Sequence, residues 1–306
     1  MLSSTAQLTS QGHELDLSPD AFGYLRPSTD LVGDAVALRQ RMDEDGYLFL
    51  PGYLDVEQVL DARRVMCAKL DAQGLLDREY PLMDAMCKTA PEFPYMPSLA
   101  HDNPPLMRLL YTGRMMAFYE KFFGGPARHF DYTWCRSVPP GGATPPHCDS
   151  VYVGRGSTRL HTSWTPIGDV STEDGGLMVM EKSHQLESLR NHYCRTDVDA
   201  VCTNRIREDG QPRKQSPTFG MLTKNPTRMR QSLGLRWLTA DYQAGDLLVF
   251  SMFTIHTSLD NRGRRIRIST DSRYQPANEP VDDRWISIDG QPPKLHGESA
   301  RRELIC

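Results

Sequence analysis

Residues 245–259, GDLLVFSMFTIHTSL, begin with a Gly-Asp turn, continue as an apolar β-rich run and end just beyond a histidine. Many short strands separated by turn residues are typical of β-sandwiches and jelly rolls. We therefore expect an antiparallel sandwich or jelly roll in the second half of the chain. Four further runs of this kind, separated by Gly, Pro, Asn and Asp, support that expectation: HFDYTWCRSV at 129–138, LHTSWTPI at 160–167, GGLMVME at 175–181 and RIRISTDSRYQ at 265–275.

The first half of the chain has a different pattern. Apolar residues recur at helical spacing in 34–45, in 55–74 and in 105–124, and the first of these helices leads through a turn into a short strand at 47–50. Residues 1–33 are rich in Ser, Thr, Asp, Gly and Pro, which predicts an N-terminal arm. We expect these helices to form a layer beside the β-rich part.

The β-rich part is interrupted by a long polar stretch, 185–238. An insertion of that length is either disordered or functional, and we predict a lid over the site, with 78–104 as the opposite wall. The remaining residues fit one catalytic domain over 34–290 and a C-terminal tail over 291–306.

Composition limits the possible partners and compartments. The 306 residues have a net charge of -4 and a pI of about 6.1, which argues against a nucleic acid partner. No apolar run approaches the roughly 20 residues needed to span a bilayer, and the polar N-terminus does not resemble a signal peptide. The chain has no Cys-x-x-Cys pair, so free thiols in the reducing cytoplasm are the simplest interpretation of its cysteines: Cys67, Cys87, Cys135, Cys148, Cys194, Cys202 and Cys306.

Two His-x-Asp pairs are candidates for a metal site: His147 with Asp149, and His129 with Asp131. On an extended chain, residues i and i+2 point to the same side, so either pair could bind one ion. The pattern is common enough to arise by chance. A jelly roll would bring a third ligand from a remote strand, and His256 at the end of the run quoted first is the candidate. The residues alone leave open a metal site or two polar side chains that happen to be close.

Several motifs, in this order, resemble the phytanoyl-CoA dioxygenase family of iron(II)- and 2-oxoglutarate-dependent oxygenases. They are DEDGYLFLPGYL at 43–54, PPHCD at 145–149, EDGGLMVMEKSH at 173–184 and GDLLVFSMFTIHTSLDN at 245–261. The resemblance covers roughly 38–285, and one feature departs from it. The chain has MEKSH where the family more often has Pro-Gly-Ser-His, which affects the shape of one turn.

The resemblance implies a mainly β fold with helices: a double-stranded β-helix (jelly roll, cupin-like) with N-terminal helices packed on the outer sheet. It implies that His147, Asp149 and His256 are the iron ligands and the catalytic centre. His129 and Asp131 lie on a strand where the family has no ligands.

The resemblance also implies the reaction. The cosubstrates are 2-oxoglutarate and dioxygen, and the family converts 2-oxoglutarate to succinate and carbon dioxide while it hydroxylates or otherwise oxidises an unactivated C–H of a small molecule. Halogenating relatives replace the aspartate ligand with a small residue, so Asp149 favours hydroxylation.

The family places an arginine 11 residues after the second histidine ligand, which here is Arg267. A guanidinium pairs bidentately with a carboxylate, here the far end of 2-oxoglutarate. Arg265 has the same strand parity and is the alternative. The other predicted side chains are Ser258, Ser269 and Trp164 for the cosubstrate, and Arg136, Ser150 and Tyr152 for the substrate.

Other interpretations remain open at this point. His161 and His184 are expected to have structural roles, in a strand and a turn. A cupin-type metalloenzyme could use the same three ligands without 2-oxoglutarate, and a non-catalytic protein could retain a relic of the metal site. Neither the substrate nor the oligomeric state is indicated by the sequence.

Overall fold

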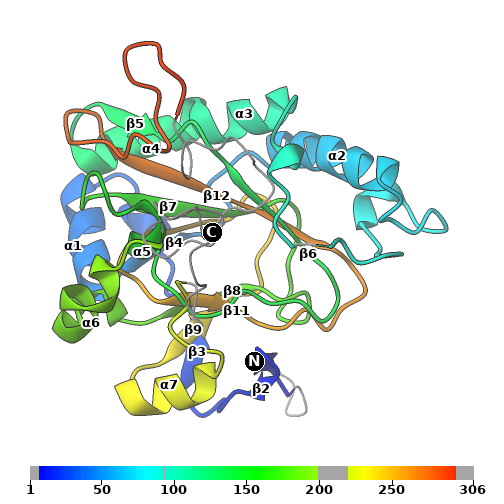
Figure 1. The fold of residues 1–306 in the computed structure, drawn as a ribbon, viewed down its shortest axis with the longest axis horizontal. Coiled ribbons are helices and arrows are strands. Elements are labelled where there is room, and N and C mark those ends of the chain that lie inside the picture. The colour runs from blue at the N-terminus through cyan, green and yellow to red at the C-terminus, as the bar shows by residue number, and fades with distance from the viewer. Residues whose placement is uncertain (1–6, 93, 199–219, 294–306) are drawn as a thin grey trace, which may run out of the picture.

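The computed structural model describes residues 7–92, 94–198 and 220–293, and two β-sheets form its centre (Figure 1). The larger sheet has the strand order β4-β10-β7-β12-β5, and β6 also pairs with β12. All of these pairs are antiparallel, as expected for a jelly roll. The strands are β4 (Tyr47–Leu50), β5 (Ala127–His129), β6 (Trp134–Val138), β7 (His161–Pro166), β10 (Leu247–Ser251) and β12 (Arg267–Pro276).

The smaller sheet has the order β11-β8-β9-β3. It comprises β3 (Phe22–Tyr24), β8 (Leu177–Met180), β9 (Trp237–Thr239) and β11 (His256–Ser258). One buried cluster contains Trp164 and Phe250 from the larger sheet and Val179 and Leu238 from the smaller one. The two sheets therefore pack face to face, and the side chains between them form the interior of the barrel.

Helices cover the other face of the larger sheet (Figure 1). Their buried side chains share a second core cluster with residues of β10 and β12, including Val249, Ile268 and Tyr274. This agrees with the expected helical layer. Its members are α1 (Ala35–Asp45), α2 (Val56–Ala72), α3 (Pro104–Tyr111) and α4 (Gly113–Phe123).

Local sequence explains where these helices begin and end. The Asp34 and Asp55 carboxylates accept backbone N–H groups at the start of α1 and α2. Gly46 ends α1 with a φ of 82°, which favours glycine and turns the chain into β4. The single helix expected over 105–124 is two helices, because the chain is extended at Thr112.

Strand β12 is the longest in the structure that is described, and it organises the larger sheet. It pairs with β5, β6 and β7, and all ten of its residues are buried. Successive side chains of a strand point to opposite faces. Ile268 and Tyr274 belong to the helix-covered cluster, so Arg267, Asp271 and Arg273 point into the barrel.

The N-terminal segment expected to be an arm packs against this barrel. Its described residues form a hairpin of β1 (Thr9–Ser10) and β2 (His13–Glu14), and β3 pairs with β9 in parallel. The expected lid contains α6 (Glu187–Asn191) and α7 (Pro226–Leu233), and its last residues enter β9. Residues 199–219 of the expected lid, and 294–306 of the expected tail, lie outside the described residues.

Two further observations concern the cysteines and the helices. Five cysteines in the described residues are free thiols: Cys67, Cys87, Cys135, Cys148 and Cys194. Within the described ranges, we find no helix with the length and apolar character that crossing a membrane requires.

Candidate active site

Three side chains of ligand type converge inside the barrel. His147, Asp149 and His256 are each at most 5% exposed, and their ligand atoms all lie within 4.8 Å of one another. The Oδ1 atom of Asp149 is 3.9 Å from Nε2 of His147 and 3.8 Å from Nε2 of His256. Residues separated by more than 100 positions in the chain thus share one centre.

Backbone pairing brings the two histidines together. The His147 N–H donates to the His256 carbonyl at 3.0 Å, and the His256 N–H donates back to His147 at the same distance. The chain then turns at Asp149 (φ −65°, ψ −26°), where the short helix α5 (Ser150–Val153) begins. From the sequence we expected His147 and Asp149 to lie on one extended segment, and this is wrong for Asp149. Its backbone is helical, and this turn directs the carboxylate toward the imidazoles.

Hydrogen bonds determine which nitrogen of each imidazole is available. Nδ1 of His147 donates to the Pro145 carbonyl at 2.8 Å, and Nδ1 of His256 donates to the Thr254 carbonyl at 3.0 Å. A carbonyl only accepts, so Nδ1 carries the proton and the Nε2 lone pair of each ring is left for a ligand. Burial lowers the pKa of both imidazoles, which keeps them neutral.

Asp149 is held in its ionised form. The Thr162 hydroxyl donates to Oδ2 of Asp149, and Nη2 of Arg273 donates to Oδ1 at 3.0 Å. Burial opposes ionisation, but the charge of Arg273 and the hydrogen bond from Thr162 favour the carboxylate, and the pKa of Asp149 lies below its ordinary value. Two neutral imidazoles and one carboxylate are the donor set of non-haem iron(II) oxygenases, so the residues fit that metal.

The predicted cosubstrate arginine is also inside the barrel. Arg267 is 2% exposed, and its Nη1 donates to the Ser269 hydroxyl at 2.6 Å. Its Nε and Nη2 have no partner in the structure. These two nitrogens share one edge of the guanidinium, the edge that pairs bidentately with a carboxylate. Arg265, the alternative, is exposed and precedes β12.

The surroundings of Arg267 fit an anionic ligand. Trp164 is fully buried, its Nε1 has no partner, and its ring lies 5.9 Å from the guanidinium carbon. Burial, followed by the neighbouring charge of Arg136, lowers the pKa of Arg267 to about 10. The group therefore remains charged at neutral pH, and a buried cation whose donors are unpaired favours a bound anion.

Ser258 and Arg136 have partners within the protein. Ser258 accepts the Thr144 N–H at 2.8 Å, so its hydroxyl orders the loop before His147. Nε of Arg136 donates to Asp271 at 2.8 Å, and its side chain is 21% exposed.

The predicted substrate residues Ser150 and Tyr152 follow Asp149 in α5. Ser150 is buried and lines a hollow of about 440 Å³ with Met252 and Phe253. The Tyr152 ring lies 5.5 Å from the His147 ring. Helix α5 therefore places Tyr152 beside the metal ligands and Ser150 at a neighbouring hollow.

Three histidines outside the triad, already considered from the sequence, have structural surroundings. Nδ1 of His129 donates to the Phe130 carbonyl at 2.8 Å and is 3.9 Å from Asp131, apart from the metal-ligand group. His161 packs on Phe122 with ring centroids 5.0 Å apart. His184 donates from Nε2 to the Asp43 carbonyl at 2.9 Å, which ties its turn to the end of α1.

Three residues that contact the candidate site residues Asp149 and Arg136 were not identified from the sequence: Thr162, Asp271 and Arg273. Alternation along β12 contains a signal for two of them, because Arg267, Asp271 and Arg273 have the same parity. No comparable signal marks Thr162, whose contact with Asp149 depends on how β7 and α5 are packed.

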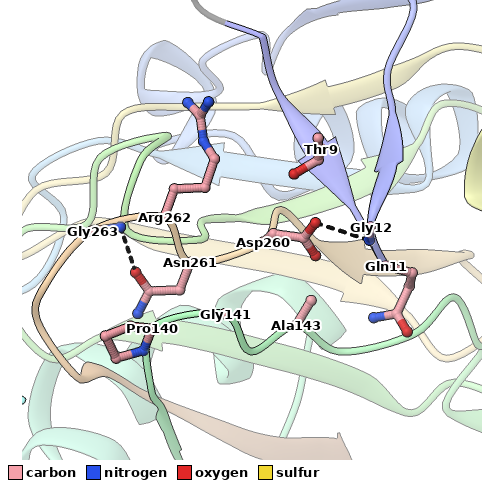
Figure 2. A pocket seen from close by; sticks show the side chains of 10 residues that line it. All are labelled: Thr9, Gln11, Gly12, Pro140, Gly141, Ala143, Asp260, Asn261, Arg262 and Gly263. Carbon is pink, nitrogen blue, oxygen red and sulfur yellow. Dashed lines mark hydrogen bonds between the residues drawn. The ribbon is translucent and has the colours of Figure 1, made fainter.

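A larger hollow of about 630 Å³ lies where the N-terminal hairpin meets the loops at 140–143 and 260–263 (Figure 2). Its polar groups bind the backbone: Asp260 accepts the Gly12 N–H and Asn261 accepts the Gly263 N–H, both at 3.0 Å. The residues that line it include neither a histidine nor a cysteine. It therefore does not provide a second set of metal ligands.

The model of one protein family, Phytanoyl-CoA dioxygenase (PhyH), matches residues 42–269, which is more than half of the chain. The chain belongs to the phytanoyl-CoA dioxygenase family. This confirms the resemblance drawn from the motifs. Membership in the phytanoyl-CoA dioxygenase family makes the protein an iron(II)- and 2-oxoglutarate-dependent dioxygenase.

Among curated proteins, this phytanoyl-CoA dioxygenase family member is similar to 1-deoxypentalenic acid 11-beta-hydroxylase of Streptomyces exfoliatus. The two are 29% identical over 261 residues, 82% of this chain and 84% of the relative. The enzyme of the same name from Streptomyces arenae is 28% identical over 270 residues.

Among solved structures, EctD from S. alaskensis has a TM-score of 0.55 at 15% identity, covering 97% of this chain and 96% of EctD. The alpha-ketoglutarate-dependent epimerase SnoN from nogalamycin biosynthesis has a TM-score of 0.52 at 20% identity, covering 81% and 84%. At these identities the likeness concerns the fold, and it confirms the jelly-roll architecture expected of the phytanoyl-CoA dioxygenase family.

Proposed function

We propose that His147, Asp149 and His256 hold the iron(II) of this enzyme and that Arg267 holds the far carboxylate of 2-oxoglutarate. The observation that carries the proposal is the pairing of a convergent two-histidine, one-carboxylate set with a buried arginine edge that lacks a partner. A cupin-type metalloenzyme that does not use 2-oxoglutarate would have no need of that arginine.

We propose further that the reaction is hydroxylation of an unactivated C–H of a small organic molecule. Bound iron with 2-oxoglutarate supplies the activation of dioxygen, and the keto acid leaves as succinate and carbon dioxide. Asp149 occupies the position whose loss characterises halogenation, and the curated relatives are named as hydroxylases.

The protein's own groups provide the setting for this chemistry. The Nδ1 protons of both histidines are held by backbone carbonyls, so the rings present Nε2 without reorientation. Thr162 and Arg273 orient the carboxylate of Asp149 and keep it ionised. Burial of all three ligands excludes bulk water from the reacting centre.

The test is succinate release by the purified protein after metal removal. Release should require both added iron(II) and added 2-oxoglutarate, and it should rise with a substrate that gains one oxygen atom by mass spectrometry. The first probe is 1-deoxypentalenic acid, followed by a panel of organic acids, each paired with its primary amide. Succinate release that is independent of iron or of 2-oxoglutarate would contradict the proposal.

A further inference from the structure

Arg273 is a buried charged residue of the barrel, and only one of its three nitrogens has a hydrogen-bond partner in the structure. Its side chain is 3% exposed, and its guanidinium carbon lies 3.8 Å from the centroid of the Trp134 ring. One nitrogen, Nη2, donates to Asp149, whereas Nε and Nη1 have no partner in the structure. A buried donor without a partner costs about 1–3 kcal/mol, so native proteins leave few of them unless a ligand completes the site.

The carboxylate of Asp149, which balances the charge of Arg273, also belongs to the proposed metal-ligand set. The Asp149 oxygen that accepts from Arg273 is Oδ1, the same atom that faces Nε2 of both histidines. That oxygen is the one placed to hold the metal, so iron and Arg273 draw on one carboxylate. A cation that shares its buried counter-ion with a divalent metal attracts a further anion.

A charge count agrees with this local argument. Asp149 and the charged side chains that β6 and β12 direct into the barrel comprise three guanidinium groups and two carboxylates, a net charge of one positive. The two positive charges of iron(II) cancel the two negative charges of 2-oxoglutarate, so one positive charge remains. The residues are Arg136, Arg267, Arg273, Asp149 and Asp271.

The surroundings of Arg273 are aromatic. Trp134 belongs to a cluster that contains Phe130 and Trp285, against which Tyr132 and Tyr152 pack. Tyr152 also lies beside His147, so this cluster extends to the metal ligands. An organic anion with an apolar skeleton would match a guanidinium set in such a wall.

We propose that Arg273 binds an anionic group, a carboxylate, of the primary substrate, and thereby positions the substrate's apolar skeleton beside the metal centre. This inference rests on the proposed function, because it concerns the substrate of the same site. The acid should accept a hydrogen bond from a donor of Arg273 that has no partner, either Nη1 or Nε, which lie on different edges of the guanidinium. Arg136 remains paired with Asp271.

The first experiment uses the wild-type enzyme and the panel of acids paired with their primary amides. Acids should stimulate succinate release and change the visible absorption of the anaerobic iron(II)–2-oxoglutarate complex, whereas their amides should do neither. Amides that act as well as acids would overturn the inference, and so would a panel in which no acid acts. The proposed function survives both of these outcomes if 2-oxoglutarate turnover still requires iron.

The second experiment uses variants. Arg273→Met keeps an unbranched stem over Trp134 and removes the donors, and Arg273→Lys keeps the charge. Removing one partner of a buried charged pair should weaken binding of the stimulating acid at least about 30-fold in Arg273→Met, with a smaller loss in Arg273→Lys. The matched control Arg128→Met, on the exposed face of β5, should bind the acid as the wild type does.

Two measurements separate substrate recognition from a role in holding Asp149 or 2-oxoglutarate. Acid affinity is measured on complexes already saturated with iron and 2-oxoglutarate, and the dissociation constant of 2-oxoglutarate is measured separately. An Arg273→Met enzyme that still prefers acid to amide, or whose principal loss is in 2-oxoglutarate affinity, would overturn the inference. Failure of the wild type to bind iron or 2-oxoglutarate would instead overturn the proposed function.

Discussion

Successive residues of strand β12 point to opposite faces of the larger sheet, and the two faces carry different kinds of side chain. Toward the helices, the strand presents Ile268 and Tyr274, and the Tyr274 ring stacks on Tyr119 with centroids 4.0 Å apart. Toward the barrel interior, it presents Arg267, Asp271 and Arg273.

The faces also differ in the charge of the buried groups that the fold leaves without a partner. On the helix-covered face of β12 this group is the neutral Thr270 hydroxyl, and on the barrel face the groups are donors of two guanidinium cations. The Tyr274 hydroxyl donates to the Leu110 carbonyl at 2.6 Å, so this polar group on the helix-covered face has its partner within the fold. Arg267 and Arg273 each keep two nitrogens without a partner. Buried donors of this kind destabilise a protein, and they persist at functional sites where a ligand provides the missing partner. The comparison thus distinguishes a face that serves stability from one that serves binding.

The largest effect is expected at the metal centre. His256→Ala removes one ligand and should reduce iron affinity and succinate formation at least about 100-fold, since even residues that only support ligands contribute 10–100-fold. The backbone bonds between residues 256 and 147 remain, so the circular dichroism spectrum should be unchanged. Wild-type iron content in the variant would remove His256 from the ligand set.

The next effect concerns the cosubstrate. Arg267→Met leaves a buried carboxylate of 2-oxoglutarate without its cation, and the dissociation constant of 2-oxoglutarate should rise by roughly two to three orders of magnitude. The same substitution at exposed Arg265 is the matched control and should leave that constant unchanged. If both substitutions raised the dissociation constant of 2-oxoglutarate equally, the assignment of Arg267 as its carboxylate partner would be contradicted.

Two threonines of β7 allow the faces to be compared directly. Thr162 points inward and donates to Asp149, so Thr162→Val should lower iron affinity about 10-fold. Thr165 points to the other face, is fully buried, and its hydroxyl has no partner in the structure. Thr165→Val should leave iron affinity unchanged and raise the free energy of unfolding by up to about 1 kcal/mol, measured by urea denaturation. If Thr165→Val lowered iron affinity and Thr162→Val did not, the orientation of β7 would be contradicted.

The smallest effect is a pH dependence on the helix-covered face. Burial lowers the pKa of His161 to about 4, below the 6.5 of an ordinary histidine. As the pH falls from 6.5 toward 4, the unfolded chain binds a proton that the folded protein resists, so the free energy of unfolding decreases. His161→Phe removes this contribution. Between pH 7 and pH 5 the variant should lose about 1 kcal/mol less than the wild type, allowing for the part exposure of His161. Identical losses in urea denaturation would contradict the shifted pKa.

Much of the architecture was predictable from local patterns. Helical spacing predicted α1 and its turn into β4, and β-rich runs between turn residues predicted β7, β8, β10 and β12. The break at Thr112 was not predicted, because the apolar pattern continues across it while the backbone becomes extended. The periodicity of apolar residues indicates which side chains share a face, but it does not reveal a single residue at which the helix is interrupted.

The sequence by itself determined the family, through motifs in a specific order, and with the family came the candidate ligands and Arg267. Only the tertiary structure brought His147 and Asp149 together with His256. It leaves His129 and Asp131 outside that centre, as the family resemblance predicted. Strand parity could have indicated that Arg273 points inward, but not that it shares an oxygen of Asp149 with the two imidazoles. The reason is physical: alternation is a local property of a strand, whereas burial, counter-charges and missing hydrogen-bond partners depend on segments more than 100 residues apart.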